Sequence, residues 1–211
     1  INLKTSANPW GNNWDGADGD ALDIGEKIGL KVTQGNGYQI VPFWGGRVLD
    51  YAGGDIYLNA EGERFVDENL PWHKIVEVIL EWPKTEFTVI TDTQSEKGAT
   101  LGVKLLSGIV KKASSIREVA VGMGIPEEKL RKTLDEYNQS VEAGRDKFGK
   151  TVFTQRIEKP PFYWGKENIY VHTSLDGLKT DEEARVLDKD GRVVLGLFAA
   201  GEVVGGVFGK D

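Results

Sequence analysis

The chain contains no cysteine, only two histidines and no long hydrophobic run. The absence of thiols excludes disulfides, thiolate metal sites, iron–sulfur clusters and a cysteine nucleophile. A histidine-based zinc site would need both His73 and His172, and their spacing does not suggest one, so no metal site is expected. No stretch approaches the roughly 18 apolar residues of a transmembrane helix, so no membrane span is expected.

Basic residues are also fewer than acidic ones. The sequence has 26 lysines and arginines against 33 acidic residues, a formal net charge of -7. Nucleic-acid binding needs a basic face, so a nucleic-acid partner is not expected. With 39% apolar residues in 211 positions, the chain is long enough for one large domain or two small ones with a buried core.

Glycine is abundant, with 27 residues, where a typical protein has about 7%. Eleven glycines precede residue 60 and five lie in the last sixteen residues, whereas only seven lie between Glu63 and Trp164. This distribution predicts turn-rich ends and a middle built of regular elements. The chain begins at Ile1 and stops at Asp211 just after an apolar, glycine-rich run, and we interpret it as a segment of a longer protein.

Local patterns predict a mixture of helices and strands. Helices are expected over residues 20–28, over 116–124 behind a capping box of Ser115 and Glu118, and from 127 until Gly144. Residues 73–82 fit either a buried strand or a short helix. Strands are expected over residues 38–43, 55–59, 87–91 and 195–200, with a hairpin over 186–194 whose turn is Asp-Gly.

The run over residues 197–206 is the first candidate for chemistry. Glycines after a buried strand let the backbone approach a bulky ligand, and Glu202 can accept hydrogen bonds from ribose or ribityl hydroxyls. The same pattern also fits a plain tight turn. The dinucleotide pattern Gly-x-Gly-x-x-Gly is absent from the sequence, so a complete Rossmann unit is not expected.

His172 is the second candidate. Its imidazole can donate a hydrogen bond to a carbonyl or carboxylate oxygen and can change charge near neutral pH, although a purely structural histidine fits equally. His73, beside Trp72, is interpreted as structural. The six tryptophans can line a sugar-like or steroid-like ligand or simply form core.

Seven stretches follow one family's patterns in the same order along the chain. Residues 59–68 read Asn-Ala-Glu-Gly-Glu-Arg-Phe-Val-Asp-Glu, and residues 115–150 contain Gly-Ile-Pro, Thr133 and Tyr137-Asn138. Together they resemble the flavoproteins of the fumarate reductase/succinate dehydrogenase type, which include soluble fumarate reductases, urocanate reductases and 3-ketosteroid dehydrogenases. The stretches cover residues 16–21, 59–68, 115–150, 160–163, 172–173, 177–181 and 197–206.

The resemblance implies an α+β fold and FAD as the cofactor. It implies a cap, or clamp, domain over residues 30–173, inserted into a split Rossmann-like FAD domain of which residues 1–29 and 174–211 are incomplete pieces. It also implies a small-molecule substrate and an electron partner that the sequence does not identify.

The resemblance further implies which residues form the site. On the cofactor side it implies Gly19, Asp20, Gly201, Glu202, Gly205 and Gly206. On the substrate side it implies His172 holding a substrate oxygen, with Thr173 beside it. Trp72 as a cavity wall and Tyr51 as a proton donor or acceptor are hypotheses for this chain that the family pattern does not supply.

Three positions depart from the fumarate reductase pattern. Trp72 stands where those enzymes have a proton-donating arginine, and the places of their relay glutamate and arginine fall on Val48 and Tyr51. A proton relay cannot run through valine and tryptophan, so fumarate itself is not the expected substrate. The Pro71-aromatic pair is closer to ketosteroid dehydrogenases, whereas Gly201-Glu202 is closer to the reductases, and the substrate stays open.

Two functional hypotheses follow. In the first, the chain is a fragment of an FAD-dependent oxidoreductase that moves a hydride between flavin and a substrate carbon adjacent to a carbonyl or carboxylate, and the fragment alone is inactive. In the second, the chain is a non-catalytic ligand-binding or interaction module whose tryptophans form the contact surface.

Overall fold

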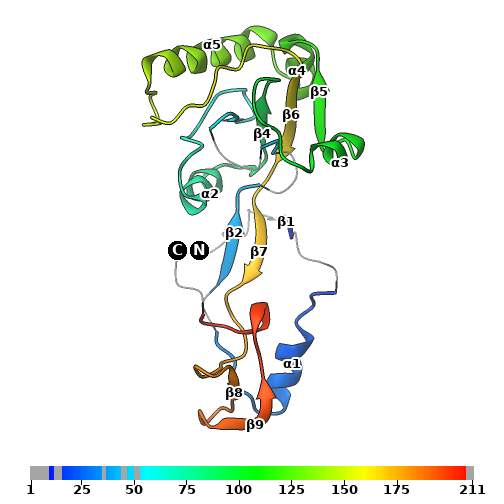
Figure 1. The fold of residues 1–211 in the computed structure, drawn as a ribbon, viewed down its shortest axis with the longest axis vertical. Helices are drawn as coiled ribbons and strands as arrows, with labels where there is room; N and C mark the ends of the chain where they lie inside the picture. Colours follow the sequence, from blue (N-terminus) through cyan, green and yellow to red (C-terminus); the bar gives the residue numbers. More distant parts are fainter. Residues whose placement is uncertain (1–9, 12–15, 35–36, 44–46, 50–52, 208–211) are drawn as a thin grey trace. The chain divides into compact units, whose positions relative to one another are not determined.

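The computed structural model describes residues 10–11, 16–34, 37–43, 47–49 and 53–207 (Figure 1). The chain divides into two compact units. Unit 1 comprises Ile1–Val41 and Tyr170–Asp211, and unit 2 comprises Pro42–Ile169. The predicted roles of residues 1–29, 30–173 and 174–211 as flavin-domain pieces and cap remain predictions.

Unit 2 is built on a four-stranded antiparallel sheet of order β3-β4-β6-β5. Its strands are β3 (Ile56–Leu58), β4 (Phe87–Thr91), β6 (Phe162–Glu167) and β5 (Val110–Ala113). Every residue of β3 and β4 is buried, although alternate side chains of a strand point to opposite faces. Both faces of these strands are therefore covered.

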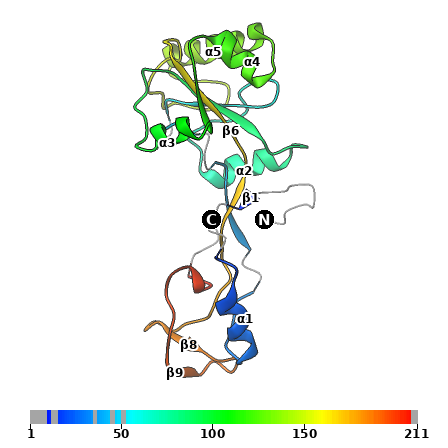
Figure 2. The same cartoon turned by 90° about the vertical axis from the view of Figure 1, so that its right-hand side faces the viewer.

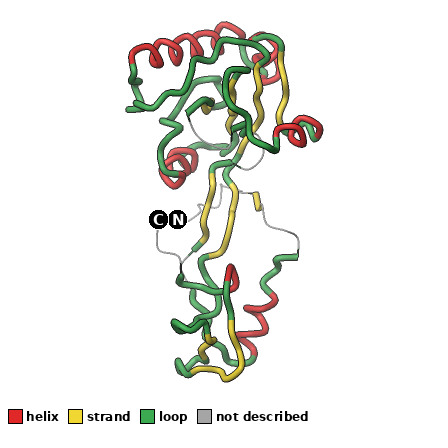
Figure 3. The backbone as a smooth tube through the Cα atoms, in the orientation of Figure 1, coloured by secondary structure: helices red, strands yellow, loops and turns green. Residues whose placement is uncertain are grey.

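Helices α4 (Ile116–Met123) and α5 (Glu127–Ala143) pack on one face of the sheet (Figures 1 and 3). The side chain of Ser115 caps α4 by accepting a hydrogen bond from the Glu118 amide at 3.3 Å. Gly124 and Gly144, both left-handed, end the two helices. The core on this face includes Ile56, Leu58, Ile90, Val119, Ala120, Leu130, Leu134, Tyr137 and Trp164.

A row of aromatic rings packs within unit 2 around Tyr57, which lies between Ile56 and Leu58 in β3 and so points to the other face. Ring centroids are 5.5 Å apart between Tyr57 and Phe87, 5.8 Å between Phe87 and Phe65, and 4.4 Å between Phe65 and Trp82. Trp82 follows α2 (Trp72–Leu80), whose buried residues are Ile75, Val76 and Ile79. Helix α3 (Leu101–Leu106) contacts β5.

Unit 1 contains a small three-stranded sheet of order β1-β7-β2 (Figure 1). Strand β7 (Tyr170–Ser174) pairs in parallel with β1 (Trp10–Gly11) and antiparallel with β2 (Tyr38–Val41). The unit also contains helix α1 (Asp20–Lys27), the hairpin of β8 (Arg185–Leu187) and β9 (Val193–Phe198), and the 3-10 turn η1 (Gly201–Val203) (Figure 2). Its buried hydrophobic residues include Leu30, Leu178 and Val186.

The structure confirms the mixed helix and strand character of the chain. The helices expected over 20–28, 116–124 and from 127 to Gly144 are α1, α4 and α5, and the open choice over 73–82 is decided as the helix α2. The strand expected over 38–43 is too long, because β2 ends at Val41 and Pro42 has no amide hydrogen to continue the ladder. The strand expected over 55–59 is likewise shorter, at Ile56–Leu58.

Candidate functional site

The turn after β9 and the strand β7 meet in unit 1. Glu202, exposed in η1, accepts a hydrogen bond from the hydroxyl of Thr173 at 2.5 Å. His172 precedes Thr173 in β7 and is exposed. One contact therefore joins the acid expected at the cofactor to the His172-Thr173 pair expected at the substrate.

Gly201, Gly205 and Gly206 lie close to Glu202 in the sequence, and the structural reason for glycine differs among these positions. Gly201 has a φ of +80°, and no described atom lies within 4 Å of where its Cβ would be, so its backbone is open to a ligand. Gly206, at φ +75°, also adopts a conformation that favours glycine. A Cβ on Gly205 would collide with the Thr33 hydroxyl and the backbone of Gly177. Packing within the chain therefore accounts for Gly205 without any ligand.

Gly19 and Asp20 lie at the start of α1. Gly19 is the N-cap residue at φ +88°, and Asp20 is the first helical residue. Both are exposed. Their open backbone and acceptor carboxylate fit hydroxyl groups of a nucleotide, as do those of Gly201 and Glu202. The residues present thus fit the hydroxyl-bearing part of FAD, whereas the sequence holds no glycine-rich phosphate loop.

Trp72 and Tyr51 stand apart from this group. Trp72 begins α2 in unit 2, and the edge of its ring meets Phe43 with centroids 5.4 Å apart. About half of Trp72 is exposed (49%), so part of this residue is accessible to a ligand. Tyr51 lies outside the described residues. His172 belongs to unit 1 and Trp72 to unit 2.

Unit 2 also contains a buried ionic network centred on Glu68. Both Glu68 oxygens accept hydrogen bonds from Arg64, at 2.8 Å each, and one also accepts from the fully buried ammonium of Lys150 at 2.8 Å. The Tyr57 amide donates to Glu68 at 3.3 Å. Arg64 reaches Asp146 at 2.8 Å. Each charged side chain of the network is paired with a side chain of opposite charge, and this pairing offsets the free energy cost of removing the charges from water.

Asp55 is also buried in unit 2, but without the hydrogen bonds that Glu68 accepts. The sequence analysis did not identify it. It is 0% exposed, and neither carboxylate oxygen has a hydrogen-bond partner among the described residues. The Arg47 Nε lies 3.6 Å away. Burial raises the pKa of Asp55 to about 7, although Arg47 opposes this shift. No motif marks Asp55, so only its surroundings identify it.

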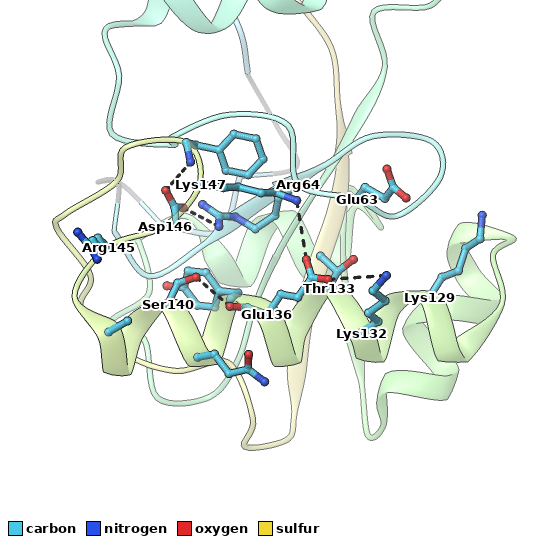
Figure 4. A pocket seen from close by; sticks show the side chains of 14 residues that line it. Glu63, Arg64, Lys129, Lys132, Thr133, Glu136, Ser140, Arg145, Asp146 and Lys147 are labelled. Carbon is cyan, nitrogen blue, oxygen red and sulfur yellow. Dashed lines mark hydrogen bonds and ion pairs between the residues drawn. The ribbon is translucent and has the colours of Figure 1, made fainter.

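A cavity of about 530 Å³ lies along α5 in unit 2 (Figure 4). The guanidinium of Arg64 lies 5.2 Å from the ring centroids of both Tyr137 and Phe148. None of the predicted site residues lines this cavity. Its lining includes Glu63, Arg64, Lys129, Lys132, Thr133, Glu136, Tyr137, Ser140, Arg145, Asp146, Lys147 and Phe148.

Neither a metal-binding cluster nor a membrane-spanning helix is found in the part of the chain that the structure describes. No three side chains among His, Asp and Glu gather closely enough there to hold a metal ion. Of the helices described, none is both long and apolar enough to cross a membrane.

Comparison with known proteins identifies a family whose model matches almost the whole chain. A model of the FAD binding domain matches residues 3–210. The chain is 33% identical over 202 residues to an NADH:acrylate oxidoreductase of Vibrio harveyi, which covers 90% of this chain and 20% of that protein. The chain thus spans about a fifth of the length of this curated relative.

Two solved structures share the fold. An open conformation of a flavocytochrome c3 fumarate reductase superposes with a TM-score of 0.76 at 28% identity, covering 95% of this chain and 37% of that one. A 3-ketosteroid delta1-dehydrogenase from Sterolibacterium denitrificans gives a TM-score of 0.60 at 20% identity, covering 93% of this chain and 43% of that one.

Proposed function

The chain belongs to the FAD binding domain family, and we propose that it forms part of an FAD-dependent oxidoreductase acting on a small molecule. The enzyme would move a hydride between flavin and a substrate carbon adjacent to a carbonyl or carboxylate. We propose that the chain works within a longer polypeptide, because it covers only 20% to 37% of two of its matches. Part of the FAD site, the phosphate cradle above all, would come from elsewhere in that polypeptide.

One observation carries this proposal. The hydrogen bond between Thr173 and Glu202 holds an acceptor for flavin hydroxyls beside a histidine suited to a substrate oxygen. A flavin and its substrate must lie in contact for hydride transfer, and this contact brings their proposed binding residues together. A non-catalytic module has no need of such a pairing.

The proposed roles follow from side-chain chemistry. Glu202, with the open backbone at Gly201, accepts hydrogen bonds from the cofactor, and Gly19 and Asp20 offer a second acceptor at the start of α1. His172 donates a hydrogen bond to the substrate carbonyl or carboxylate and stabilises the charge that develops there. The exposed half of Trp72 provides an apolar wall of the substrate site.

We favour reduction of a 2-enoate as the reaction. The relative with 33% identity is an acrylate oxidoreductase, and Gly201-Glu202 follows the reductase pattern. Trp72 replaces the proton-donating arginine of the fumarate reductase pattern, which disfavours fumarate itself as the substrate. Dehydrogenation of a ketosteroid is the second candidate, supported by Pro71 followed by an aromatic residue and by a half-exposed indole suited to an apolar substrate.

The test uses the full-length protein that contains this chain, purified with FAD. The flavin is reduced anaerobically, and its reoxidation is followed by absorbance after addition of acrylate, fumarate, urocanate or a 3-ketosteroid. We expect acrylate to reoxidise it faster than fumarate. A preparation that binds no flavin, or that no acceptor reoxidises, would overturn the proposal.

Histidine variants give the matched control. His172→Ala is expected to slow reoxidation at least tenfold, within the range for positioned acid–base groups. His73→Ala, at the other histidine, is expected to leave the rate unchanged, because His73 in α2 has no role in the proposed site. Equal rates for both variants would remove His172 from the site.

A further inference from the structure

The cavity along α5 in unit 2 carries more positive than negative charge. Its lining has five basic side chains and three acidic ones, although the chain as a whole has a net charge of -7. None of these residues has a part in the proposed flavin and substrate site. A hollow enriched in one charge sign focuses the electric field and attracts ligands of the opposite sign. The lining therefore favours an anion.

Four of the five basic residues are exposed, and two of them share a single carboxylate. Lys132 and Lys147 each lie 3.8 Å from Glu136, one at each carboxylate oxygen, so neither ammonium is within hydrogen-bonding distance (Figure 4). Arg131, on the same helix but outside the cavity, by contrast lies 2.6 Å from Glu127. Lys132 and Lys147 thus leave their hydrogen-bond donors to solvent or to a ligand.

Contacts within unit 2 fix the walls of the cavity. The hydroxyl of Thr133, on α5, donates to the carbonyl of Gly62 at 2.7 Å, which ties the helix to the turn before Arg64. Arg64 in turn lies 2.8 Å from Asp146, whose other carboxylate oxygen accepts from the Phe148 amide at 2.8 Å. The loop after α5 is thus joined to the same turn. A ligand therefore meets a surface that is already formed, which lowers the entropy cost of binding.

The remaining two exposed basic residues mark opposite ends of the cavity. Lys129 lies in the first turn of α5, and Arg145 follows the end of the helix at Ala143 (Figure 4). Neither side chain makes a hydrogen bond or an ion pair with another described residue. Along the helix, Lys129 and Ala143 are about 21 Å apart, at about 1.5 Å per residue. A single small anion cannot reach across this length, whereas about six residues of extended peptide can, at about 3.3 Å each.

We propose that this cavity is a docking site for an extended acidic segment, about six residues long, of a partner protein. Carboxylates spaced along the segment pair with the exposed basic side chains at the two ends and in the middle of the cavity. The docking site shares no residue with the proposed redox site and does not depend on the identity of the substrate.

A second copy of this chain fits the cavity less well than a separate partner. The longest uninterrupted acidic run of the chain covers residues 181–183. Arg185 lies 2.6 Å from Asp181 and 3.0 Å from Glu183, so this run already has its cation. The acidic segment is therefore expected on another protein.

Fluorescence anisotropy of labelled hexaglutamate measures the binding, with the full-length protein that contains this chain. We expect hexaglutamate to bind at least about tenfold more tightly than hexaglutamine, which has the same length and no charge. Its affinity should fall when the salt concentration is raised from about 0.05 to about 0.5 M, because salt screens exposed charges. Failure of hexaglutamate to bind, or equal binding of the two peptides, overturns the inference.

Two matched double variants locate the contact. Lys129→Gln/Arg145→Gln removes the charges at the two ends of the cavity and should weaken hexaglutamate binding about fivefold or more, as expected for the loss of two exposed ion pairs. Lys112→Gln/Arg117→Gln removes the same charge at exposed positions outside the cavity and should leave the affinity almost unchanged. Equal losses in both double variants would show general charge attraction and overturn the inference.

The single variants distinguish an extended ligand from a compact anion. Lys129→Gln and Arg145→Gln should each weaken hexaglutamate binding, because the segment reaches both ends of the cavity. A loss in only one of them, or displacement of the label by citrate as effectively as by unlabelled hexaglutamate, identifies a compact anion and overturns the inference. Failure of every acceptor to reoxidise the flavin of the unmodified protein overturns the proposed function instead and leaves the peptide measurement intact.

Discussion

Glu68 and Asp55 are both buried carboxylates of unit 2, and their surroundings give them opposite properties. Glu68 is stabilised as an anion by Arg64, Lys150 and the Tyr57 amide. Among the described residues Asp55 forms an ion pair with Arg47, at 3.6 Å, and burial outweighs the lowering of its pKa by Arg47 and Lys150. The two buried carboxylates thus differ by the four hydrogen bonds that Glu68 accepts and Asp55 does not.

Asp55→Asn is expected to change how stability depends on pH. The pKa of Asp55 is raised from 3.8 to about 7 by folding, so the folded state keeps a proton that the unfolded state loses. The stability contributed by this group is present below about pH 4 and is lost as pH rises to about 7. Asp55→Asn should therefore be more stable than the unmodified protein at pH 8, by on the order of 2 to 4 kcal/mol.

Urea unfolding of both proteins between pH 4 and pH 8 measures this effect. The difference in unfolding free energy should shrink towards pH 4, where both side chains are neutral. Asp135→Asn, the same change at an exposed site on α5, is the control and should follow the unmodified protein throughout. A constant difference across the range would show that Asp55 does not change its protonation there.

Lys150→Met is expected to destabilise unit 2 strongly. Lys150 is fully buried and donates to Glu68 at 2.8 Å, and removing one partner of a buried pair costs about 3 to 5 kcal/mol. Lys147→Met is the matched control, because Lys147 is 66% exposed and lies 3.8 Å from Glu136, a contact worth about 0 to 1 kcal/mol. Chemical denaturation measures both, and similar losses would contradict the network.

At the scale of elements, two helical glycines have different surroundings. Gly122 lies in α4, and a Cβ there would collide with the ring of Trp164 in β6. Gly102 lies in α3, and no described atom is within 4 Å of its added Cβ. Close packing of α4 on the sheet therefore requires glycine at position 122, whereas the packing of α3 does not require glycine at position 102.

Exchanging each glycine for alanine separates packing from helix propensity. Gly122→Ala is expected to cost about 1 to 3 kcal/mol, because Trp164 must move out of its packed position. Gly102→Ala is expected to stabilise by up to about 1 kcal/mol, the difference in helix propensity. Thermal unfolding of the two variants measures these changes, and a stabilising Gly122→Ala would show that α4 does not pack as described.

The elements also differ in how well local sequence predicts them. Helices α4 and α5 carry their own start and stop signals, so their ends were predictable from Ser115, Gly124 and Gly144. Strands β5 and β6 were not predicted. Lysines interrupt both, and they form strands because β6 pairs with β4 and β5. Helix α3, six residues long with an internal glycine, was also missed.

At the scale of the whole molecule, the two units have cores of very different size. The described residues of unit 2 include a cluster of thirteen buried hydrophobic side chains, whereas the corresponding cluster of unit 1 has three. Hydrophobic burial is the main source of stability, so local opening is expected to be easier in unit 1. Binding of a cofactor to unit 1 would then add stability where the chain has least.

Hydrogen exchange on the 211-residue chain tests this difference. Amides of β4 and α5 should exchange at least tenfold more slowly than those of β8 and β9 at the same pH. The prediction compares hydrogen-bonded amides only, so solvent exposure of loops does not enter. Equal protection in the two units would show that their stability does not follow the size of these clusters.

The sequence by itself determined the boundaries of α4 and α5, the Asp-Gly hairpin, the mixed helix and strand character and the likeness to flavoproteins, because each rests on signals a few residues long. Of the proposed site, it indicated Glu202 and His172 by type and neighbours. Tertiary structure decided what depends on distant residues. Thr173 meets Glu202 across 29 positions, β6 exists through its partners, and Asp55 becomes a proton-holding group only because folding surrounds it without hydrogen bonds.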